Sequence, residues 1–341
     1  MKEKQILFTF DYELFLGSKS GSVKNCMLEP TEKVVKILNK NNVKGIFFVD
    51  CSYLNRLESA AEDNIKAKND YQSIKSQLES LIEQGHYIYP HIHPHWIDAL
   101  YIPELNEWDL SNDAKYRINS LTIEERVEHF DSSMKALNKI LNNVSLNYKI
   151  DAYRAGGWCI QPFQVFAPLF NQHKIVVDFS VLGGGIKDGN TLNYDFKSID
   201  YNSSPYRFET NVNQKSEFGK YREYPISSIL INKKAISNKI INKILWKIPY
   251  GRNTGDGIGA VFKSFSRNPS DYDLTKEMVS IELLTINKLK TYNRFLKDNE
   301  YMQFISHPKM ISKHNLDTLS KFLKKATANY SIESDWRNIK I

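Results

Sequence analysis

Apolar residues recur along the chain in two kinds of pattern. The first is a short, nearly continuous apolar run, which is typical of a strand covered on both faces, as in a parallel sheet. The clearest run is 45–49, Gly-Ile-Phe-Phe-Val. Further strand candidates are 6–10, 149–153, 175–179 and 302–305.

Between these runs, apolar residues return at spacings of three and four, which predicts amphipathic helices. The clearest helix begins at Thr122, where Thr-x-x-Glu is a capping-box pattern, and continues to Leu141. Another helix ends at Gly85, a residue type that suits the position just after a helix. Further helices are predicted from Pro30 onward and over 163–170, 273–296 and 316–323.

Alternating strands and helices over this length favour one α/β domain over two independent ones, built as an α/β barrel or a doubly wound sheet. We therefore treat 1–341 as a single domain. Two long segments, 97–121 and 182–270, fit the alternation poorly and are predicted to be insertions of the kind that cover functional sites.

The second insertion contains a basic segment, 233–247, with five lysines, no acidic residue and several isoleucines between the lysines. This pattern suits a helix that makes peripheral contact with an anionic membrane surface. An ordinary surface helix with a solvated lysine face explains the same pattern. The sequence leaves both interpretations open.

Composition narrows the class of protein. The 341 residues are 41% hydrophobic and 25% charged, which is enough apolar material for a large core and excludes a disordered chain. No apolar stretch approaches the length of a membrane-spanning helix, and the first residues do not resemble a secretory signal. We expect a cytoplasmic protein, with a place at the inner face of the cell membrane if 233–247 binds lipid.

The net charge of +7 comes without a nucleic-acid recognition motif, so no nucleic-acid partner is expected. The three cysteines lack metal-binding spacing and are expected to be buried free thiols.

Two carboxylates stand at the end of the first predicted strand. Asp11 and Glu13 are separated by one residue, and residues spaced by two point the same way in an extended backbone. Strand ends are where α/β barrels place their reactive groups. The two carboxylates can therefore share a site, one binding a metal ion and the other handling a proton.

Three of the eight histidines fall within five residues, His91-Ile-His93-Pro-His95. His91 and His95 can converge on one ion in a helical turn, whereas an extended backbone would align all three. Two imidazoles with one carboxylate and an open position form a hydrolytic zinc site. His93 and the nearby His86 are interpreted as supporting or surface residues rather than ligands.

Other strand ends carry further candidates. Arg154 directly follows the strand at 149–153 and stands two residues before a Gly-Gly pair. It can clamp a carboxylate, while the glycines allow a substrate to approach the backbone. Asp178 and His307 follow later strands. A histidine paired with an aspartate can act as general acid toward a leaving amine.

In order and spacing, these segments resemble the polysaccharide deacetylases of the NodB-homology family, carbohydrate esterase family 4. The resemblance spans about 6–323 and rests on five segments that begin at Asp11, His91, Arg154, Asp178 and His307. It implies a distorted, seven-stranded (β/α) barrel that binds one divalent metal ion. Zinc is the expected ion, with cobalt and nickel as alternatives.

Carried over by position, Asp11 matches the catalytic base and His91 and His95 match the metal ligands. Many members have Asp-Asp in the first motif, but this chain has Tyr12 at the second position. Some relatives use Asp-x-Asp or Asp-x-Glu instead, so Glu13 is taken as the third ligand.

The remaining motifs supply the other roles. Arg154 matches the arginine that orients the base, although Arg-Ala-Gly-Gly-Trp replaces the common Arg-x-Pro, and Trp158 is placed on the groove wall. Asp178 matches the acid that tunes the catalytic histidine, His307 matches that histidine, and Ile305 matches the apolar residue that receives the acetyl methyl group.

The resemblance implies a metal-dependent hydrolase that removes the N-acetyl group of an amino sugar in a glycan or a surface-polysaccharide precursor. In such a reaction Asp11 takes a proton from the metal-bound water and His307 protonates the leaving amine. Glycan O-deacetylation and hydrolysis of a non-sugar cyclic amide are enzymatic alternatives. A catalytically silent, membrane-associated glycan-binding scaffold is an alternative of a different class.

Overall fold

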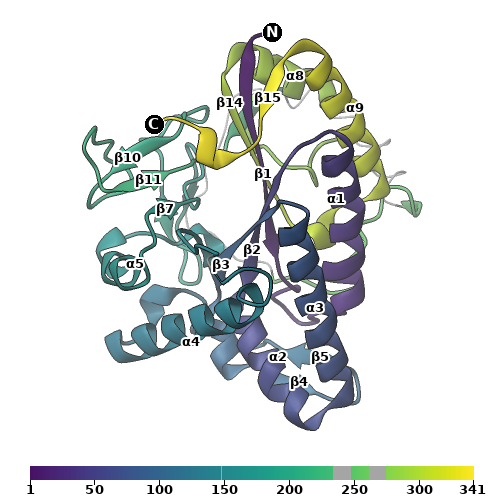
Figure 1. The fold of residues 1–341 in the computed structure, drawn as a ribbon, viewed down its shortest axis with the longest axis vertical. Helices are drawn as coiled ribbons and strands as arrows, with labels where there is room; N and C mark the ends of the chain where they lie inside the picture. Colours follow the sequence, from purple (N-terminus) through teal and green to yellow (C-terminus); the bar gives the residue numbers. More distant parts are fainter. Residues whose placement is uncertain (147, 233–246, 261–273) are drawn as a thin grey trace.

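The fold is built around one curled sheet of mostly parallel strands. The computed structural model describes residues 1–146, 148–232, 247–260 and 274–341. Along the sheet the strand order is β10-β11-β7-β6-β3-β2-β1-β14, and β15 pairs with the first residues of β1 (Figure 1). The strands are β1 (Glu3–Tyr12), β2 (Gly45–Asp50), β3 (Tyr87–Ile92), β6 (Ala152–Ala155), β7 (Val177–Asp178), β10 (Tyr206–Phe208), β11 (Tyr221–Glu223), β14 (Tyr301–Ser306) and β15 (Ser331–Glu333).

Seven strands of this sheet, from β11 to β14, run parallel to their neighbours, whereas β10 is antiparallel to β11. The two ends of this seven-strand run, β11 and β14, are linked by isolated hydrogen bonds rather than by a strand pair. The Ser227 amide, shortly after β11, donates to the Gln303 carbonyl of β14 at 3.4 Å, and the Gln303 amide donates to the Ser227 hydroxyl at 3.0 Å. The predicted α/β fold with seven parallel strands is thus confirmed, in the form of an incompletely closed half-barrel.

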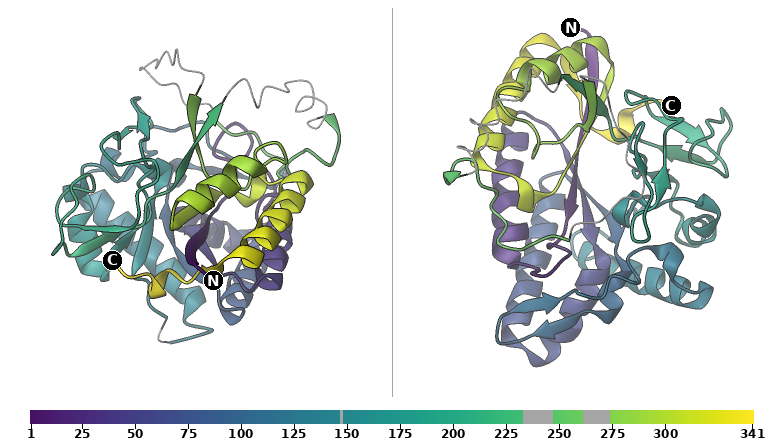
Figure 2. Two further views of the ribbon diagram at one scale, coloured as in Figure 1. Left: turned by 90° about the horizontal axis from the view of Figure 1, so that it is seen from above. Right: turned by 180° about the vertical axis from the view of Figure 1, so that it is seen from behind.

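Helices cover the outside of the curled sheet (Figure 2). They form because each presents an apolar stripe to the strands, while side-chain caps fix the first turns of α2, α3, α4 and α9. In α4 the Thr122 hydroxyl accepts the Glu125 amide and the Glu125 carboxylate accepts the Thr122 amide, as the capping-box pattern predicted. The helices are α1 (Glu29–Lys40), α2 (Cys51–Asp63), α3 (Ile65–Glu83), α4 (Ile123–Leu141), α5 (Ala167–His173), α8 (Leu289–Asp298) and α9 (Lys313–Asn329).

Short helical turns complete several strand-to-helix connections. A π-helical turn, Lys24–Leu28, precedes α1, and a 3₁₀ turn, Pro308–Met310, follows β14. The other 3₁₀ turns are Pro94–Asp98, Ile118–Ser120, Gly156–Trp158, Phe163–Val165 and Trp336–Asn338.

The single helix predicted over 273–296 is wrong. Its first part is the strand β13 (Leu274–Met278), which pairs with β12 (Ser228–Asn232), and helix α8 begins only at Leu289. Leu274, Met278 and Ile281 are spaced by four and three, which imitates a helix, but pairing with β12 satisfies the backbone of β13 instead.

Both predicted insertions contain short antiparallel pairs. The segment 97–121 holds β4 (Leu100–Ile102) and β5 (Glu107–Asp109), and the longer segment begins with β8 (Ile186–Lys187) and β9 (Tyr194–Asp195). The basic helix predicted over 233–247 lies almost wholly outside the described residues. In the part of the chain that is described, no helix combines the length and apolar character needed to cross a lipid bilayer.

Candidate active site

The carboxyl ends of the central parallel strands gather the candidate residues at one edge of the sheet. Asp11 lies near the end of β1, His91 near the end of β3 and Arg154 in β6. Because β1, β2, β3 and β6 are consecutive in the sheet, these ends meet on the same side. Asp11 is 3% exposed and Arg154 fully buried. The sequence prediction that strand-end groups share one site therefore holds for these residues.

Arg154 fixes Asp11 in place. Its Nη1 donates to Asp11 Oδ1 at 2.7 Å, its Nη2 donates to the Thr9 hydroxyl at 2.7 Å, and its Nε donates to the Phe179 carbonyl at 2.9 Å. The guanidinium also lies over the Phe48 ring, 4.2 Å from its centre. Burial alone would raise the pKa of Asp11, but Arg154, assisted by His91 and His307, lowers it. Asp11 is therefore held as an ionised carboxylate in one orientation.

Glu13, His91 and His93 form a buried group whose ligand atoms lie within 4.8 Å of one another. Glu13 Oε2 is 3.6 Å from His91 Nε2 and 3.3 Å from His93 Nε2. His91 Nδ1 lies 2.9 Å from the Arg154 carbonyl, which can only accept, so Nδ1 carries a proton and Nε2 is free to be a ligand. Within the described residues Glu13 Oε2 has no hydrogen-bond partner. The donor set of one carboxylate and two imidazoles fits a divalent ion such as zinc.

His93 enters this group in place of the expected His95. His91 and His93 are two residues apart on an extended backbone, and their ring centres are 4.7 Å apart. His95 lies in the 3₁₀ turn beyond them, with its ring stacked on Tyr116 at 5.2 Å. Both ring nitrogens of His95 are buried and make no hydrogen bond to the described part of the chain. The geometry thus favours His93 as the second histidine ligand, and His95 as a ligand remains a prediction.

Lys309 is an unexpected member of the site. Its Nζ donates to Glu13 Oε1 at 2.9 Å and to the Leu14 carbonyl at 2.5 Å, and the side chain is buried. Burial would raise the pKa of Glu13, but Lys309, together with His91 and His93, holds it well below its usual range. One carboxylate oxygen of Glu13 thus faces an ammonium group while the other faces the two imidazoles.

His307 lies across the site from the other histidines. Its Nε2 is 3.7 Å from Asp11 Oδ2 and 3.7 Å from Glu13 Oε1. Its backbone amide donates to Glu282 Oε2 at 2.8 Å, and its Nδ1 lies 3.4 Å from both carboxylate oxygens of Glu282. Burial would lower the pKa of His307, but Glu282, followed by Asp11 and Glu13, raises it to about 9. At 22% the His307 side chain is more exposed than those of Asp11 and Glu13, at 4% and 6%.

Asp178 does not lie beside His307 as expected. It accepts the Ser180 hydroxyl at 2.7 Å and faces Glu223 on the neighbouring strand β11. Burial raises the pKa of Asp178, and burial together with Asp178 raises that of Glu223 well above its usual range. The two acids therefore lie next to each other, both with raised pKa values, and Glu282 takes the place beside His307.

Trp158 and Ile305, the two residues expected to contact the substrate, differ in their exposure to solvent. Trp158 is partly exposed and lies in the 3₁₀ turn after β6, where its ring packs against Tyr194 at 5.9 Å. Ile305 is fully buried in β14, opposite Thr9 of β1. Both assignments to substrate binding remain predictions.

The first insertion reaches the histidines. Tyr116 is buried with its ring 4.8 Å from that of His93 and 5.2 Å from that of His95. Gly156 allows the turn after β6 to pass close to His93, because a Cβ at this position would lie 2.8 Å from His93 Nδ1 and 2.4 Å from the Ile92 carbonyl oxygen. Tyr116 of the segment 97–121 therefore packs against the histidines of the site, and the assignment of this segment as an insertion stays a prediction.

A further acid, Asp50, borders the site from β2. Its carboxylate accepts the Trp96 indole N–H at 2.6 Å and caps α2 through the Tyr53 amide at 3.2 Å. Burial, assisted by the charge of Glu13, raises the pKa of Asp50 to about 7. In the sequence, Asp50 could have been noticed as an acid that directly follows the fully apolar run 45–49. Lys309, two residues after His307, and Glu282, in a misassigned helix, gave no comparable signal.

Comparison with known proteins gives matches only among solved structures. No family model matches the chain, and no curated protein matches it. A protein described as a polysaccharide deacetylase from Mycobacterium smegmatis is similar, with 14% identity, a TM-score of 0.47, and coverage of 96% of this chain and 85% of that one. The catalytic domain of a peptidoglycan N-acetylglucosamine deacetylase from Eubacterium rectale gives 11% identity, a TM-score of 0.41, and coverage of 99% and 91%. A 4-alpha-glucanotransferase from Thermococcus litoralis gives 12% identity and a TM-score of 0.47. The match covers 99% of this chain and 40% of that one. All three TM-scores lie below 0.5, so we rest the function on the residues of the site.

Proposed function

We propose that the chain is a metal-dependent deacetylase that hydrolyses the N-acetyl group of an amino sugar in a glycan or a surface-polysaccharide precursor. One observation carries the proposal: a buried Glu13–His91–His93 group lies next to an aspartate fixed by Arg154 and a histidine held by Glu282. This arrangement provides a cation site, a base and an acid around one point. Amide hydrolysis needs all three functions.

Glu13, His91 and His93 would hold the ion, with His95 as the alternative histidine. The lone pair on His91 Nε2 faces the unpartnered Glu13 Oε2, and two electron-rich atoms in this relation need a proton or a cation between them. When bound, a divalent ion would supply Lewis acidity toward the amide carbonyl and toward a water molecule. Zinc suits these donors best, and cobalt or nickel would suit them as well.

Asp11 is the general base in this proposal. The carboxylate is ionised because Arg154 lowers its pKa, and Asp11 Oδ2 is the oxygen not engaged by Arg154 Nη1. Oδ2 also faces His307 Nε2 at 3.7 Å, so it points toward the open side of the site. A water molecule attacking the acetyl carbonyl there would lose its proton to Asp11.

His307 is the general acid. With its pKa raised to about 9, the ring is protonated at neutral pH, and Glu282 holds Nδ1 so that Nε2 faces the reaction centre. An amine leaving group must gain a proton as the C–N bond breaks. His307 is also the most exposed of the three residues Asp11, Glu13 and His307, which places it where a bulky sugar would approach.

The test compares acetate release from N-acetylglucosamine oligomers by zinc-loaded wild type, Asp11→Asn and His307→Gln. Removing the base or the acid should lower kcat by about 10²-fold or more with little change in the zinc content. Full activity in Asp11→Asn would contradict the assigned base. Acetate release from O-acetylated glycans alone would favour the O-deacetylase alternative.

The absence of zinc-dependent turnover on all N- and O-acetylated sugars would contradict the proposal and favour the glycan-binding scaffold. A screen of cyclic amides as substrates tests the remaining alternative, hydrolysis of a non-sugar cyclic amide. The cytoplasmic location, the single catalytic domain over 1–341 and membrane contact through 233–247 stay predictions. For the last, flotation with anionic liposomes is the direct measurement.

A further inference from the structure

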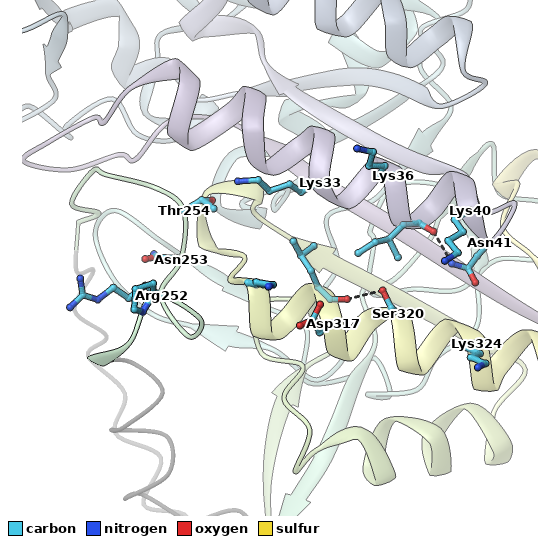
Figure 3. Close-up of a pocket in the computed structure, with 14 residues that line it drawn as sticks. Lys33, Lys36, Lys40, Asn41, Arg252, Asn253, Thr254, Asp317, Ser320 and Lys324 are labelled. Atoms are coloured by element: carbon cyan, nitrogen blue, oxygen red, sulfur yellow. Dashed lines mark hydrogen bonds between the residues drawn. The ribbon is translucent and has the colours of Figure 1, made fainter.

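A basic groove lies on the outside of the barrel, between α1 and α9 (Figure 3). Its volume is about 980 Å³. The walls are the exposed faces of the two helices, and the segment 249–254 closes one end. None of the residues proposed for catalysis or metal binding lines it. We call it the α1–α9 groove.

The groove carries a large excess of positive charge. Its single acidic lining residue is Asp317, and its cations come from both walls and from the closing segment. Lys36, Lys40 and Lys324 form no ion pair with any residue that the structure describes, whereas Lys33 pairs with Glu29 at 3.3 Å. The six cationic lining residues are Lys33, Lys36, Lys40, Arg252, Lys313 and Lys324.

Helical spacing places these cations in rows. Lys33, Lys36 and Lys40 are separated by three and four residues, so they follow one face of α1 over about 10 Å. Lys313 is the first residue of α9 and Lys324 stands three turns later, about 16 Å away along the helix. Like charges gathered on one concave surface repel each other, and an anion bound between the rows would relieve that repulsion.

The floor of the groove is apolar. Ile37 lies between the α1 lysines, Leu316 lies in the first turn of α9, and Pro249 is the first residue of the closing segment. Thr254, at the closed end, has a buried hydroxyl that is without a hydrogen-bond partner among the described residues. The groove thus offers cations at its walls and an apolar base.

We propose that the α1–α9 groove binds a diphosphate ester that carries an apolar or aromatic group. A diphosphate places several negative charges within reach of cations on both walls, whereas one carboxylate would leave most of them unmatched. The apolar floor suits the rest of such a ligand, and the volume falls in the range of small-molecule sites. Nucleoside diphosphates and prenyl diphosphates share this chemistry.

The groove and the candidate active site are joined by one stretch of chain. Beyond Thr254, the Gly255 amide donates to the Lys309 carbonyl at 2.9 Å, and Lys309 contacts Glu13. The proposal nevertheless does not depend on deacetylation, because ligand binding in the groove is measured without turnover. Failure of one proposal therefore leaves the other standing.

The test is calorimetric titration of the full-length, metal-stripped protein at about 50 mM salt, where surface charges are weakly screened. The probes are pyrophosphate, ADP and farnesyl diphosphate. Removing the metal prevents phosphates from binding through an ion at Glu13. We expect at least one of the two esters to bind, and the Lys36→Ala/Lys324→Ala variant to bind it about tenfold more weakly.

Lys66→Ala/Lys135→Ala is the matched control, because it removes two exposed lysines from α3 and α4, far from the groove in the sequence, with the same change in net charge. It should bind the ester as wild type does. Preference for ADP or for farnesyl diphosphate tells whether the source is a nucleotide or a lipid. No binding of any probe, or an equal loss in both double variants, would overturn the proposal. Pyrophosphate binding as tight as that of either ester would show that the apolar floor contributes nothing.

Discussion

Glu282 holds His307 through both its backbone and its ring. One carboxylate accepts the His307 amide at 2.8 Å and faces the ring Nδ1 at 3.4 Å. The amide contact fixes the carboxylate relative to the backbone, so its charge cannot move away from the ring. Among the charges around His307, that of Glu282 does most to raise the pKa of the ring, against the opposing effect of burial.

Replacing that charge should move the alkaline limit of catalysis. A general acid works in its protonated form, so activity falls as the pH rises through the pKa of His307, which is about 9. In Glu282→Gln the pKa of His307 should fall, so the alkaline limb of kcat/KM should move to lower pH. A pH profile from about 6 to 10 measures this. Asp178→Asn is the comparison variant, and a matching shift there would restore Asp178 to the role that the sequence gave it.

The choice between His93 and His95 can be decided by metal content. His93 Nε2 is 3.3 Å from Glu13 Oε2, whereas the His95 ring stacks on Tyr116. His93→Gln should therefore weaken zinc binding by at least about 100-fold, and His95→Gln by clearly less. Elemental analysis and competition with a chelator give both values. The opposite order would return His95 to the ligand set.

Lys309 should oppose cation binding while it supports the fold. Its ammonium group neutralises the buried Glu13 carboxylate, so Lys309→Met should destabilise the metal-free protein by about 3 kcal/mol. Because a positive charge next to the ligand is removed, zinc should then raise the Tm more than it does in wild type. Lys288→Met is a control, since Lys288 pairs with Glu277 at 2.6 Å and neither residue belongs to the metal-ligand group. An equal zinc-induced rise in all three proteins would contradict this role.

Part of the candidate site could be read from strand ends. Asp11 and Arg154 stand at the ends of strands that the sequence predicts, whereas strand β3, which carries His91, was not among the predicted strands. Parallel neighbours bring all three ends together. Glu13 was found because alternate residues of an extended chain share a side. On sequence alone, His95 rather than His93 is chosen as the second histidine ligand, because the residue at which the extended backbone ends and the 3₁₀ turn begins cannot be read from the sequence.

Site residues that lie outside strand ends could not be predicted from the sequence. Glu282 lies in a connection that was mistaken for part of a helix, and nothing in its neighbourhood indicates that it meets His307, 25 residues later. Tyr116 comes from an insertion whose path depends on packing against the histidines. Long-range contacts made by irregular segments leave no periodic pattern in a sequence.

His86, far from the site, should make stability depend on pH. Its Nδ1 accepts the Gly45 amide at 2.9 Å, and burial, assisted by Lys44, lowers the pKa of His86 to about 4. The unfolded chain takes up this proton near pH 6.5, but the folded chain does not until about pH 4, so stability is lost as the pH falls between these values. Between pH 7 and 5 this group should cost about 2 kcal/mol. His86→Asn keeps an acceptor for Gly45 without titrating, so urea unfolding of this variant should lose about 2 kcal/mol less over the same range. Equal losses in the two proteins would mean that folding does not lower the pKa of His86.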